Sequence, residues 1–333
     1  MKIRNFILFI LMTLPLMYLA STSAAAAAGY FETGKHLYEQ EKYSQSYPYL
    51  KKALSSKHPE TYAMLGYLYR EGYGVKQNYQ KAFFLYLDGA KLGDAKSQFG
   101  LGYMYKNGQF VRQDYTKAKN WYEHSAKQGY PSAMSNLGLL YKNKDAPFRD
   151  EKIAFDWMMK AAIKDHLAAQ YNIGYFYDSG IGTKKDYVEA RRWYEKAANK
   201  GHPSAQLNLG ILYYEGNGGE KDAVKGSELI KKSADQGEKN AQYTLGCSYE
   251  TGRGLAQSDE NALYWYRKAA ENDSALAMDR LAKAYQQGLF GLEKSPVKWD
   301  YWQKRAAETR ARTHEVDPSS WTLFDWIKYK LGN

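Results

Sequence analysis

The sequence is poor in the residues that most often build catalytic and metal sites. Cys247 is the one cysteine among 333 residues, so no internal disulfide can form and no cysteine cluster can hold a metal. The six histidines include no H-x-x-x-H or H-E-x-x-H pair. No basic neighbour that would activate Cys247 as a nucleophile is identifiable. We therefore predict no catalytic residue, no cofactor and no metal, and interpret the chain as a non-enzyme.

The N-terminus carries the one apolar stretch that resembles a targeting segment. Lys2 and Arg4 precede apolar residues 6–19, and small residues with several A-x-A-like sites follow at 21–28. This order is typical of a secretory signal peptide. A transmembrane helix needs about 20 apolar residues, which is longer than this stretch. We predict that residues 1–28 are a signal peptide and that the protein is periplasmic or secreted; the cleavage site stays open.

The charge balance is basic. Removing residues 1–28 takes away Lys2 and Arg4 and no acidic residue, which leaves a formal net charge of +9 instead of +11. A basic protein can bind nucleic acid, an anionic membrane surface or an acidic protein. Export argues against nucleic acid. Scattered lysines that only keep the protein soluble are the alternative, and the charge alone does not decide between them.

A repeat of 36 residues organises most of the chain. An apolar–glycine pair, Leu65-Gly66, recurs five more times at that interval and a seventh time as Leu281-Ala282. A tyrosine follows each Gly or Ala by three residues, and an alanine recurs later in each unit. The tyrosines are Tyr69, Tyr105, Tyr141, Tyr177, Tyr213, Tyr249 and Tyr285. So regular a register predicts a repeat protein.

Each unit is expected to form two helices. In the fourth, residues 168–178 and 187–199 have helical spacing of apolar residues, and the turn that begins Gly180-Ile181-Gly182 separates them. Glycine accepts the left-handed conformation that ends helices. The recurring Gly of the first helix and Ala of the second allow the two to approach closely. The pattern predicts an all-α fold.

These motifs resemble the Sel1-like repeat, a relative of the tetratricopeptide repeat. The fourth unit matches best, with Ile173-Gly174, Tyr177, Gly180, Trp193-Tyr194 and Lys196-Ala197-Ala198. The resemblance covers residues 60–309 as seven repeats and implies a right-handed α/α solenoid of helical hairpins. The third repeat has Lys144 in place of the turn glycine, so we expect a reshaped loop there. The fifth has Gly226 and the seventh Ala282 at normally constant positions.

Two segments flank the repeats. Residues 29–59 have the pattern of a tetratricopeptide-like hairpin, which we expect to cap the N-terminal end. Residues 310–333 are expected to form a C-terminal capping helix, with Trp321, Phe324, Ile327 and Leu331 on one face. A helix lying at a membrane surface is the alternative, because lysines and aromatic residues alternate near this end.

The resemblance also implies a binding surface, because the first helix of each pair lines the concave face of tetratricopeptide solenoids. Tyrosine suits an interface, having a rigid ring and a polar tip. An asparagine row could hold the main chain of an extended peptide. Packing between helices and helix capping are the alternatives. The predicted partner-binding residues are Tyr67, Phe99, Tyr103, Asn136, Tyr171, Asn172, Tyr175, Asn208 and Tyr243.

The most favoured function is an exported adaptor or scaffold that binds a protein partner in the solenoid groove. The resemblance implies one specific form, an immunity protein that neutralises a secreted lipase-type effector. The alternatives are a cell-wall or β-lactam hydrolase, as described for cysteine-rich relatives, and an envelope or membrane-surface assembly factor. The partner's identity and the oligomeric state stay open.

Overall fold

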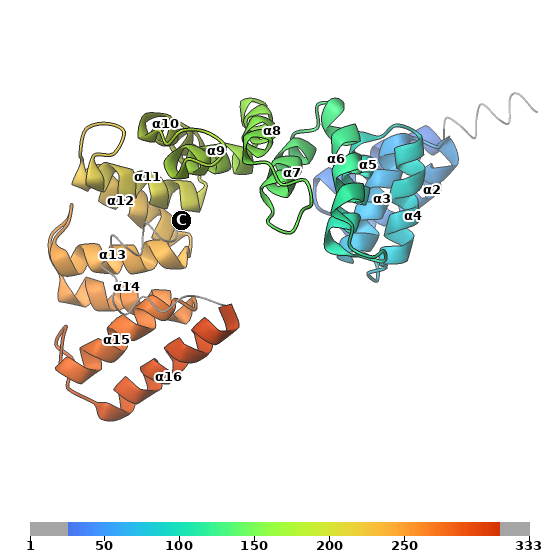
Figure 1. Cartoon of the computed structure of the whole chain (residues 1–333). Coiled ribbons are helices and arrows are strands. Elements are labelled where there is room, and N and C mark those ends of the chain that lie inside the picture. Colours follow the sequence, from blue (N-terminus) through green and yellow to red (C-terminus); the bar gives the residue numbers. More distant parts are fainter. Residues whose placement is uncertain (1–25, 314–333) are drawn as a thin grey trace, which may run out of the picture. The chain divides into compact units, whose positions relative to one another are not determined.

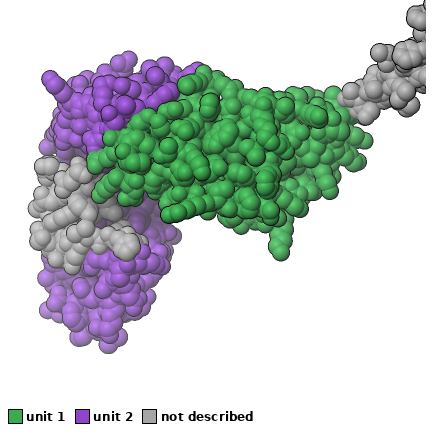
Figure 2. Space-filling model, turned by 45° about the vertical axis from the view of Figure 1, so that its right-hand side comes forward, with its two compact units in different colours: residues 1–149 green, residues 150–333 purple. Residues whose placement is uncertain are grey.

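The computed structural model describes residues 26–313 and divides the chain into two compact units, 1–149 and 150–333 (Figure 2). Within the described residues every regular element is a helix, and there is no strand. The all-α solenoid fold expected from the repeat register is therefore confirmed. No described helix combines the length and apolar character needed to cross a membrane.

Unit 1 begins with a helix whose described part covers residues 26–39. The helices that follow pair as hairpins, α3 with α4 and α5 with α6 (Figure 1). Their bounds are α2 Tyr43–Ala53, a short 3-10 turn η1 Leu54–Ser56, α3 Pro59–Glu71, α4 Tyr79–Lys91, α5 Ala95–Asn107, α6 Tyr115–Lys127 and α7 Pro131–Lys142.

Unit 2 continues the same alternation, and its strongest packing lies within the pairs α9–α10, α11–α12, α13–α14 and α15–α16 (Figure 1). The bounds are α8 Glu151–Ile163, α9 Leu167–Ser179, α10 Tyr187–Asn199, α11 Pro203–Glu215, α12 Ala223–Asp235, α13 Lys239–Thr251, α14 Asp259–Glu271, α15 Ala275–Gln287 and α16 Pro296–Thr313.

Periodic caps fix where the helices begin and end. The second helix of a repeat starts after a polar residue whose side chain accepts a backbone N–H three residues on, as Asp114 does from Lys117 at 2.8 Å. The first helix ends at a glycine with positive φ, such as Gly180 at 73°. The predicted helix-stop role of these glycines is confirmed. The capping residues are Asn78, Asp114, Asp150, Asp186, Asp222 and Ser258.

The recurring glycine of the first helix makes room for an aromatic ring. A Cβ atom on Gly174 would lie 2.6 Å from the ring of Tyr194 in α10, and one on Gly102 would lie 2.6 Å from Tyr122 in α6. Both tyrosines are fully buried. The glycine therefore packs against the tyrosine of the second helix within the same repeat, which explains why the sequence tolerates its low helix propensity.

The loop of the third repeat is irregular, as the absence of its glycine predicted. α7 is followed by Asn143 in extended conformation, where the other complete repeats have a left-handed glycine. The division between the two units falls in this loop, between Arg149 and Asp150. The third repeat thus contributes its first helix to unit 1 and its second helix to unit 2.

The second glycine of each regular loop joins neighbouring repeats. A Cβ on Gly218 would lie 2.2 Å from the backbone oxygen of Tyr187, at the start of the preceding repeat's second helix. Gly182 and Gly254 stand in the same relation to Glu151 and Ala223. At these three positions a side chain would overlap the neighbouring backbone, and the φ of each glycine is positive.

The predicted ends of the chain lie mostly outside the described residues. This holds for residues 1–25 of the predicted signal peptide and for 314–333 of the predicted C-terminal capping helix, including Trp321 to Leu331. α16 runs through the expected boundary at residue 309 and continues to Thr313. The segment expected to form an N-terminal capping hairpin, 29–59, contains most of the helix over residues 26–39 and α2, and the Ser46 hydroxyl of α2 donates to the backbone oxygen of Gly34.

Candidate partner-binding site on the first helices of the repeats

The predicted partner-binding residues all lie on first helices of repeats, from α3 to α13. All but Asn208 are half-buried, so part of each side chain is accessible. The structure does not bring them together into one site. It places Tyr67, Phe99, Tyr103 and Asn136 in unit 1 and the others in unit 2.

In unit 1 two of the predicted residues line one cavity. Tyr67 from α3 and Phe99 from α5 border a space of about 300 Å³. The first helices of three successive hairpins contribute to its wall, since Tyr38 comes from the helix over residues 26–39. The remaining lining residues are Ala63, Met64, Arg70, Tyr86, Lys96, Gly100 and Tyr130.

Arg70 supplies the buried charge of this cavity. Its side chain is 9% exposed, and Nε donates to Glu71 at 2.6 Å. The guanidinium carbon lies 4.3 Å from the ring centroid of Tyr103 and 5.3 Å from that of Tyr67. Cation–π contacts of this kind partly replace the water that a buried cation loses. The neighbouring tyrosines and Glu71 outweigh burial and raise the pKa of Arg70.

In unit 2 two of the predicted tyrosines pack against aromatic side chains from the next element of the chain or the next repeat. The Tyr171 ring stacks on the His202 imidazole with centroids 4.6 Å apart, and burial raises the pKa of Tyr171 to about 12. Tyr243 is tilted against Tyr266, with 5.7 Å between ring centroids. Both rings pack against a neighbouring ring and remain partly exposed. Partner binding and packing between helices, the two alternatives drawn from the sequence, are therefore compatible at these positions.

The asparagine row is not an open line of amides, which corrects the expectation. Asn208 is 3% exposed, and its amide donates to the Tyr194 hydroxyl at 3.1 Å. Asn136 donates to the backbone oxygen of Ser132, in its own helix, at 3.0 Å. Asn172 is half-buried on α9. A peptide could therefore not contact all three amides without rearranging the core around Tyr194.

The charged position four residues after the first-helix glycine is also more buried than an ordinary surface position. Asp178 is 7% exposed, and the Tyr194 hydroxyl donates to its carboxylate at 3.3 Å. Burial raises the pKa of Asp178 to about 6. At the equivalent place Glu250 accepts from Tyr266 at 2.6 Å and from Arg280 Nε at 2.9 Å. The Asp178 and Glu250 carboxylates therefore form hydrogen bonds within the fold.

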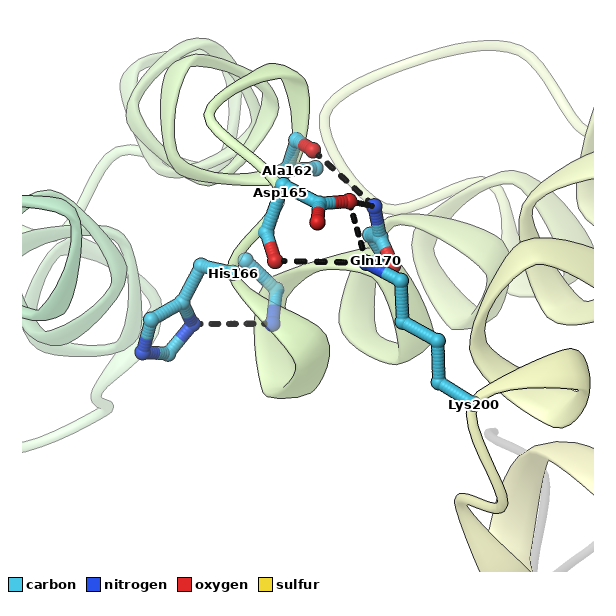
Figure 3. Close-up of polar contacts among 6 residues, drawn as sticks. Ala162, Asp165, His166, Gln170 and Lys200 are labelled. Atoms are coloured by element: carbon cyan, nitrogen blue, oxygen red, sulfur yellow. Dashed lines mark hydrogen bonds and ion pairs between the residues drawn. The ribbon is translucent and has the colours of Figure 1, made fainter.

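The joints between repeats contain a polar ladder that the sequence analysis missed. Gln170 donates to the backbone oxygen of Ala162 and to the carboxylate of Asp165, and Lys200 from the next joint also pairs with Asp165 (Figure 3). Gln206 and Gln242 repeat the bond to the preceding alanine. Glutamine at a 36-residue interval was visible in the sequence and could have revealed the ladder.

Histidines cap the first helices at several joints. His166 Nδ1 accepts the Ala169 N–H at 3.3 Å, and His202 does the same for Ala205 (Figure 3 for His166). Burial lowers the pKa of both imidazoles, which keeps them neutral and able to accept.

Cys247 lies in a setting that disfavours a nucleophilic thiolate. Burial raises the pKa of its thiol to about 11, and the Tyr266 hydroxyl lies 3.3 Å from the sulfur. A thiol with this pKa is almost wholly protonated at neutral pH. Among residues 26–313 no group of three His, Cys, Asp or Glu side chains is placed to hold a metal ion.

The stacked hairpins and their accessible first helices define an α-solenoid repeat protein. The Sel1 repeat pattern matches residues 59–94, 95–130, 131–166, 167–202, 203–238, 239–274 and 275–298, so the chain belongs to the Sel1 repeat family. Solenoids of this family are typically non-catalytic scaffolds that mediate protein–protein interaction.

Solved structures agree with this assignment. A protective antigen present in uropathogenic Escherichia coli strains, described as displaying an SLR fold, is 29% identical with a TM-score of 0.72; the match covers 96% of this chain and 68% of the antigen. A Sel1 repeat protein from Oxalobacter formigenes is 33% identical with a TM-score of 0.67, over 74% of this chain and 99% of that one.

An immunity protein from Pseudomonas aeruginosa is more distant. It is 19% identical with a TM-score of 0.47, and the match covers 67% of this chain and 84% of that one. This level of likeness carries no argument about function. No curated protein matches the chain.

Proposed function

We propose that this protein is an exported scaffold that binds a protein partner on the first helices of its repeats. One observation carries the proposal: Tyr67 and Phe99, which the repeat register selected, border a single cavity beside the buried Arg70. Unit 2 carries accessible tyrosines on its own first helices, such as Tyr175. Rigid aromatic side chains with polar tips and arginine are the residues that dominate protein interfaces.

Export is part of the proposal and rests on the N-terminal sequence. Lys2 and Arg4, the apolar stretch and the small residues up to Ala28 have the order of a cleaved signal peptide. N-terminal sequencing of protein from the periplasm and the medium tests this. Recovery of the chain with Met1 intact in the cytoplasm would contradict it.

The narrower form of the proposal is an immunity protein against a secreted lipase-type effector. A basic, exported chain suited to binding an acidic protein supports it. The test is inhibition of a purified effector lipase by the protein at equimolar concentration. Unchanged lipase activity with no complex in gel filtration would remove this form and leave the scaffold proposal standing.

The environment of the polar side chains favours a non-catalytic role. The raised pKa of Cys247 keeps its sulfur protonated, and Asp178 and Glu250 are engaged with Tyr194 and Tyr266. Hydrolysis of a chromogenic β-lactam by the purified protein, abolished by Cys247→Ser, would refute this part of the proposal.

Capture of a partner tests the scaffold function. Residues 29–333 are immobilised and exposed to envelope extract, beside a variant carrying Tyr103→Ala, Tyr171→Ala and Tyr175→Ala. We expect one protein to be retained by the wild type and lost by the variant, because three accessible rings leave the first helices together. Its identity is then established by mass spectrometry and its binding by titration of the purified protein.

A matched control changes three exposed tyrosines that lie on second helices or at the chain end instead. Tyr49, Tyr264 and Tyr301 are 37%, 50% and 53% exposed, on α2, α14 and α16. Their triple alanine variant should retain the partner. Equal retention by both variants would refute the assignment to first helices, and loss only in the control would move the site to the opposite face.

A further inference from the structure

The cavity of unit 1 combines a buried cation, phenol hydroxyls and apolar walls. Arg70 and Lys96 are its charged lining residues, and no carboxylate side chain of residues 26–313 borders it. Met64, Phe99 and the tyrosine rings provide apolar surface. A volume of about 300 Å³ is at the lower end of small-ligand sites, large enough for about one amino-acid residue.

The Arg70 guanidinium retains hydrogen-bonding capacity toward a ligand. Its Nε–H is used by Glu71, and among the described residues Glu71 alone accepts a hydrogen bond from it. A guanidinium has five N–H donors in a fixed fork, so the terminal nitrogens remain for an anion. Because Arg70 is deeply buried, an anion must enter the cavity to reach it.

Lys96 is a weaker second cation at the rim. Its Nζ lies 3.5 Å from Glu60, and Glu60 is shared with Lys35 at 3.3 Å. Burial opposes ionisation of Glu60, but the two lysines hold its pKa below the ordinary value. Lys96 is largely exposed and can leave this loose pair, whereas Arg70 cannot move away from the cavity.

The Tyr38 and Tyr86 hydroxyls of the cavity stay protonated. Burial is the main cause that raises the pKa of Tyr38 and of Tyr86, and mutual proximity of the phenols, which include Tyr67 and Tyr130, raises both further. Each hydroxyl can therefore donate at neutral pH. Phenol and guanidinium donors that converge on an enclosed, mostly apolar space favour a carboxylate over a neutral group.

We propose that the cavity around Arg70 binds the C-terminal residue of a partner polypeptide, with its α-carboxylate on Arg70 and an apolar side chain on Met64 and Phe99. A C-terminal apolar residue carries its carboxylate and a large apolar side chain on the same Cα atom. This matches a cavity wall that offers Arg70 together with Met64 and Phe99. An internal acidic side chain offers the carboxylate with only a short methylene stem. This inference deepens the scaffold function by naming the chemistry of the bound segment.

The test measures binding of small probes to residues 29–333 by isothermal titration calorimetry. N-acetyl-phenylalanine represents the C-terminal residue, and N-acetyl-phenylalaninamide differs from it only at the carboxylate. N-acetyl-glutamate N-methylamide represents an internal acidic residue. We expect the acid to bind at least tenfold more tightly than the amide and than the glutamate probe. Equal binding of acid and amide, or tighter binding of the glutamate probe, would overturn the proposal.

Two variants locate the site. Arg70→Met should abolish the preference for the acid, whereas Arg112→Met, at an exposed arginine of the same unit outside the cavity, should not change it. If Arg70→Met fails to fold by circular dichroism, Tyr67→Phe decides, since it removes one hydroxyl and keeps the ring. The acid should then bind several-fold more weakly and the amide equally well. No effect of Tyr67→Phe in that case would overturn the proposal.

Failure of this inference can be told from failure of the scaffold function. A captured partner that binds wild type and Arg70→Met equally, or binds unchanged after its last residue is amidated, leaves the scaffold role intact and refutes the C-terminal assignment. Acid-selective probe binding without any partner in extracts would support the cavity chemistry and count against the wider role.

Discussion

The two units use one repeat position in opposite ways. Four residues after the first-helix glycine, unit 2 carries Asp178 and Glu250, which accept hydrogen bonds from the second-helix tyrosines Tyr194 and Tyr266. At the same position unit 1 carries Arg70, which lies against tyrosine rings and borders a cavity. The next cation, Lys106, is half-buried, and burial lowers its pKa.

The difference shows that the repeats share the location of this residue beneath the second helix, whereas the charge of its side chain varies. An acid at this position accepts a hydrogen bond from the hydroxyl of a buried tyrosine and fills the space between the helices. A base cannot accept from that hydroxyl; in the second repeat the Tyr122 hydroxyl has no partner among the described residues. At this position unit 2 thus bonds the second-helix hydroxyls to Asp178 and Glu250, whereas unit 1 presents the donor Arg70 to a cavity.

The strongest test of this comparison is crowding of the tyrosine rings. Gly174→Ala places a methyl group 2.6 Å from Tyr194, whose hydroxyl bonds to Asp178 and Asn208 hold the ring in place. We expect a loss of about 3 kcal/mol in unfolding free energy in urea titrations. Gly102→Ala crowds Tyr122 equally but should cost only about half as much, because that ring can shift.

Gly29→Ala is the matched control for both changes. It makes the same substitution at the first residue of the predicted mature chain, where a Cβ would meet nothing within 4 Å, so it should be neutral. Equal losses for Gly174→Ala and Gly102→Ala would contradict the view that the Asp178 hydrogen bond anchors the unit 2 ring.

The second test uses pH. Burial raises the pKa of Asp178 to about 6, whereas an unfolded aspartate titrates near 4. The folded chain then holds the proton more tightly, so stability should fall as pH rises from about 4 to 6. Asp178→Asn keeps a partner for Tyr194 and should raise stability at pH 7 by roughly 2 kcal/mol, since one pKa unit is worth about 1.4 kcal/mol.

Glu250 provides a contrast of opposite sign at the equivalent position. Burial there is outweighed by the hydrogen bonds from Arg280 and Tyr266, which hold its pKa below the usual value. Its contribution to stability is present at neutral pH and is lost on acidification. Glu250→Gln should therefore destabilise the protein at pH 7. Thermal melts from pH 4 to 8 in which both variants shift in the same direction would break the comparison.

The smallest expected effect is the loss of a helix cap, which should be equal in the two units. Asp114→Ala in unit 1 and Asp186→Ala in unit 2 each remove the side chain that caps a second helix. Each should cost about 1 kcal/mol in urea unfolding, because capping depends on the local turn and not on the neighbouring repeats. Asparagine at either position keeps the acceptor and should restore most of the loss. A clear difference between units would show that the repeats are not locally equivalent.

The repeat register predicted most of the fold because the period fixes which residues are equivalent. The helix pairs, the left-handed glycines and the reshaped loop after Lys142 follow from local rules applied at each 36-residue step. The partner-binding residues were only partly accessible to this reasoning. Equivalence places Asn136, Asn172 and Asn208 on the same helix face, but burial of Asn208 depends on the neighbouring Tyr194 hydroxyl.

The Arg70 cavity was beyond the sequence for a related reason. Its wall joins Tyr38 of the N-terminal hairpin to Tyr130, which precedes α7 at the position that His166 and His202 hold in later repeats but carries a tyrosine there. Sites built from exceptions to a repeat require the distances between hairpins. The periodic caps and the glutamines at the joints, by contrast, were visible in the sequence at the constant interval.

The second glycine of each loop bears on how such chains grow. Gly182, Gly218 and Gly254 each carry half of a joint whose other half, a backbone oxygen, belongs to the preceding repeat. Since a backbone oxygen is present whatever the side chain, a duplicated segment of 36 residues can form this glycine joint with any neighbour. The joint itself therefore needs no compensating mutation when a repeat is added. Phe110 and Phe290 hold this place in two other repeats, with φ of 65° and 57°, and their rings pack against Phe83 and Tyr266 of the preceding repeat, so a copied repeat there would also need a matching aromatic neighbour.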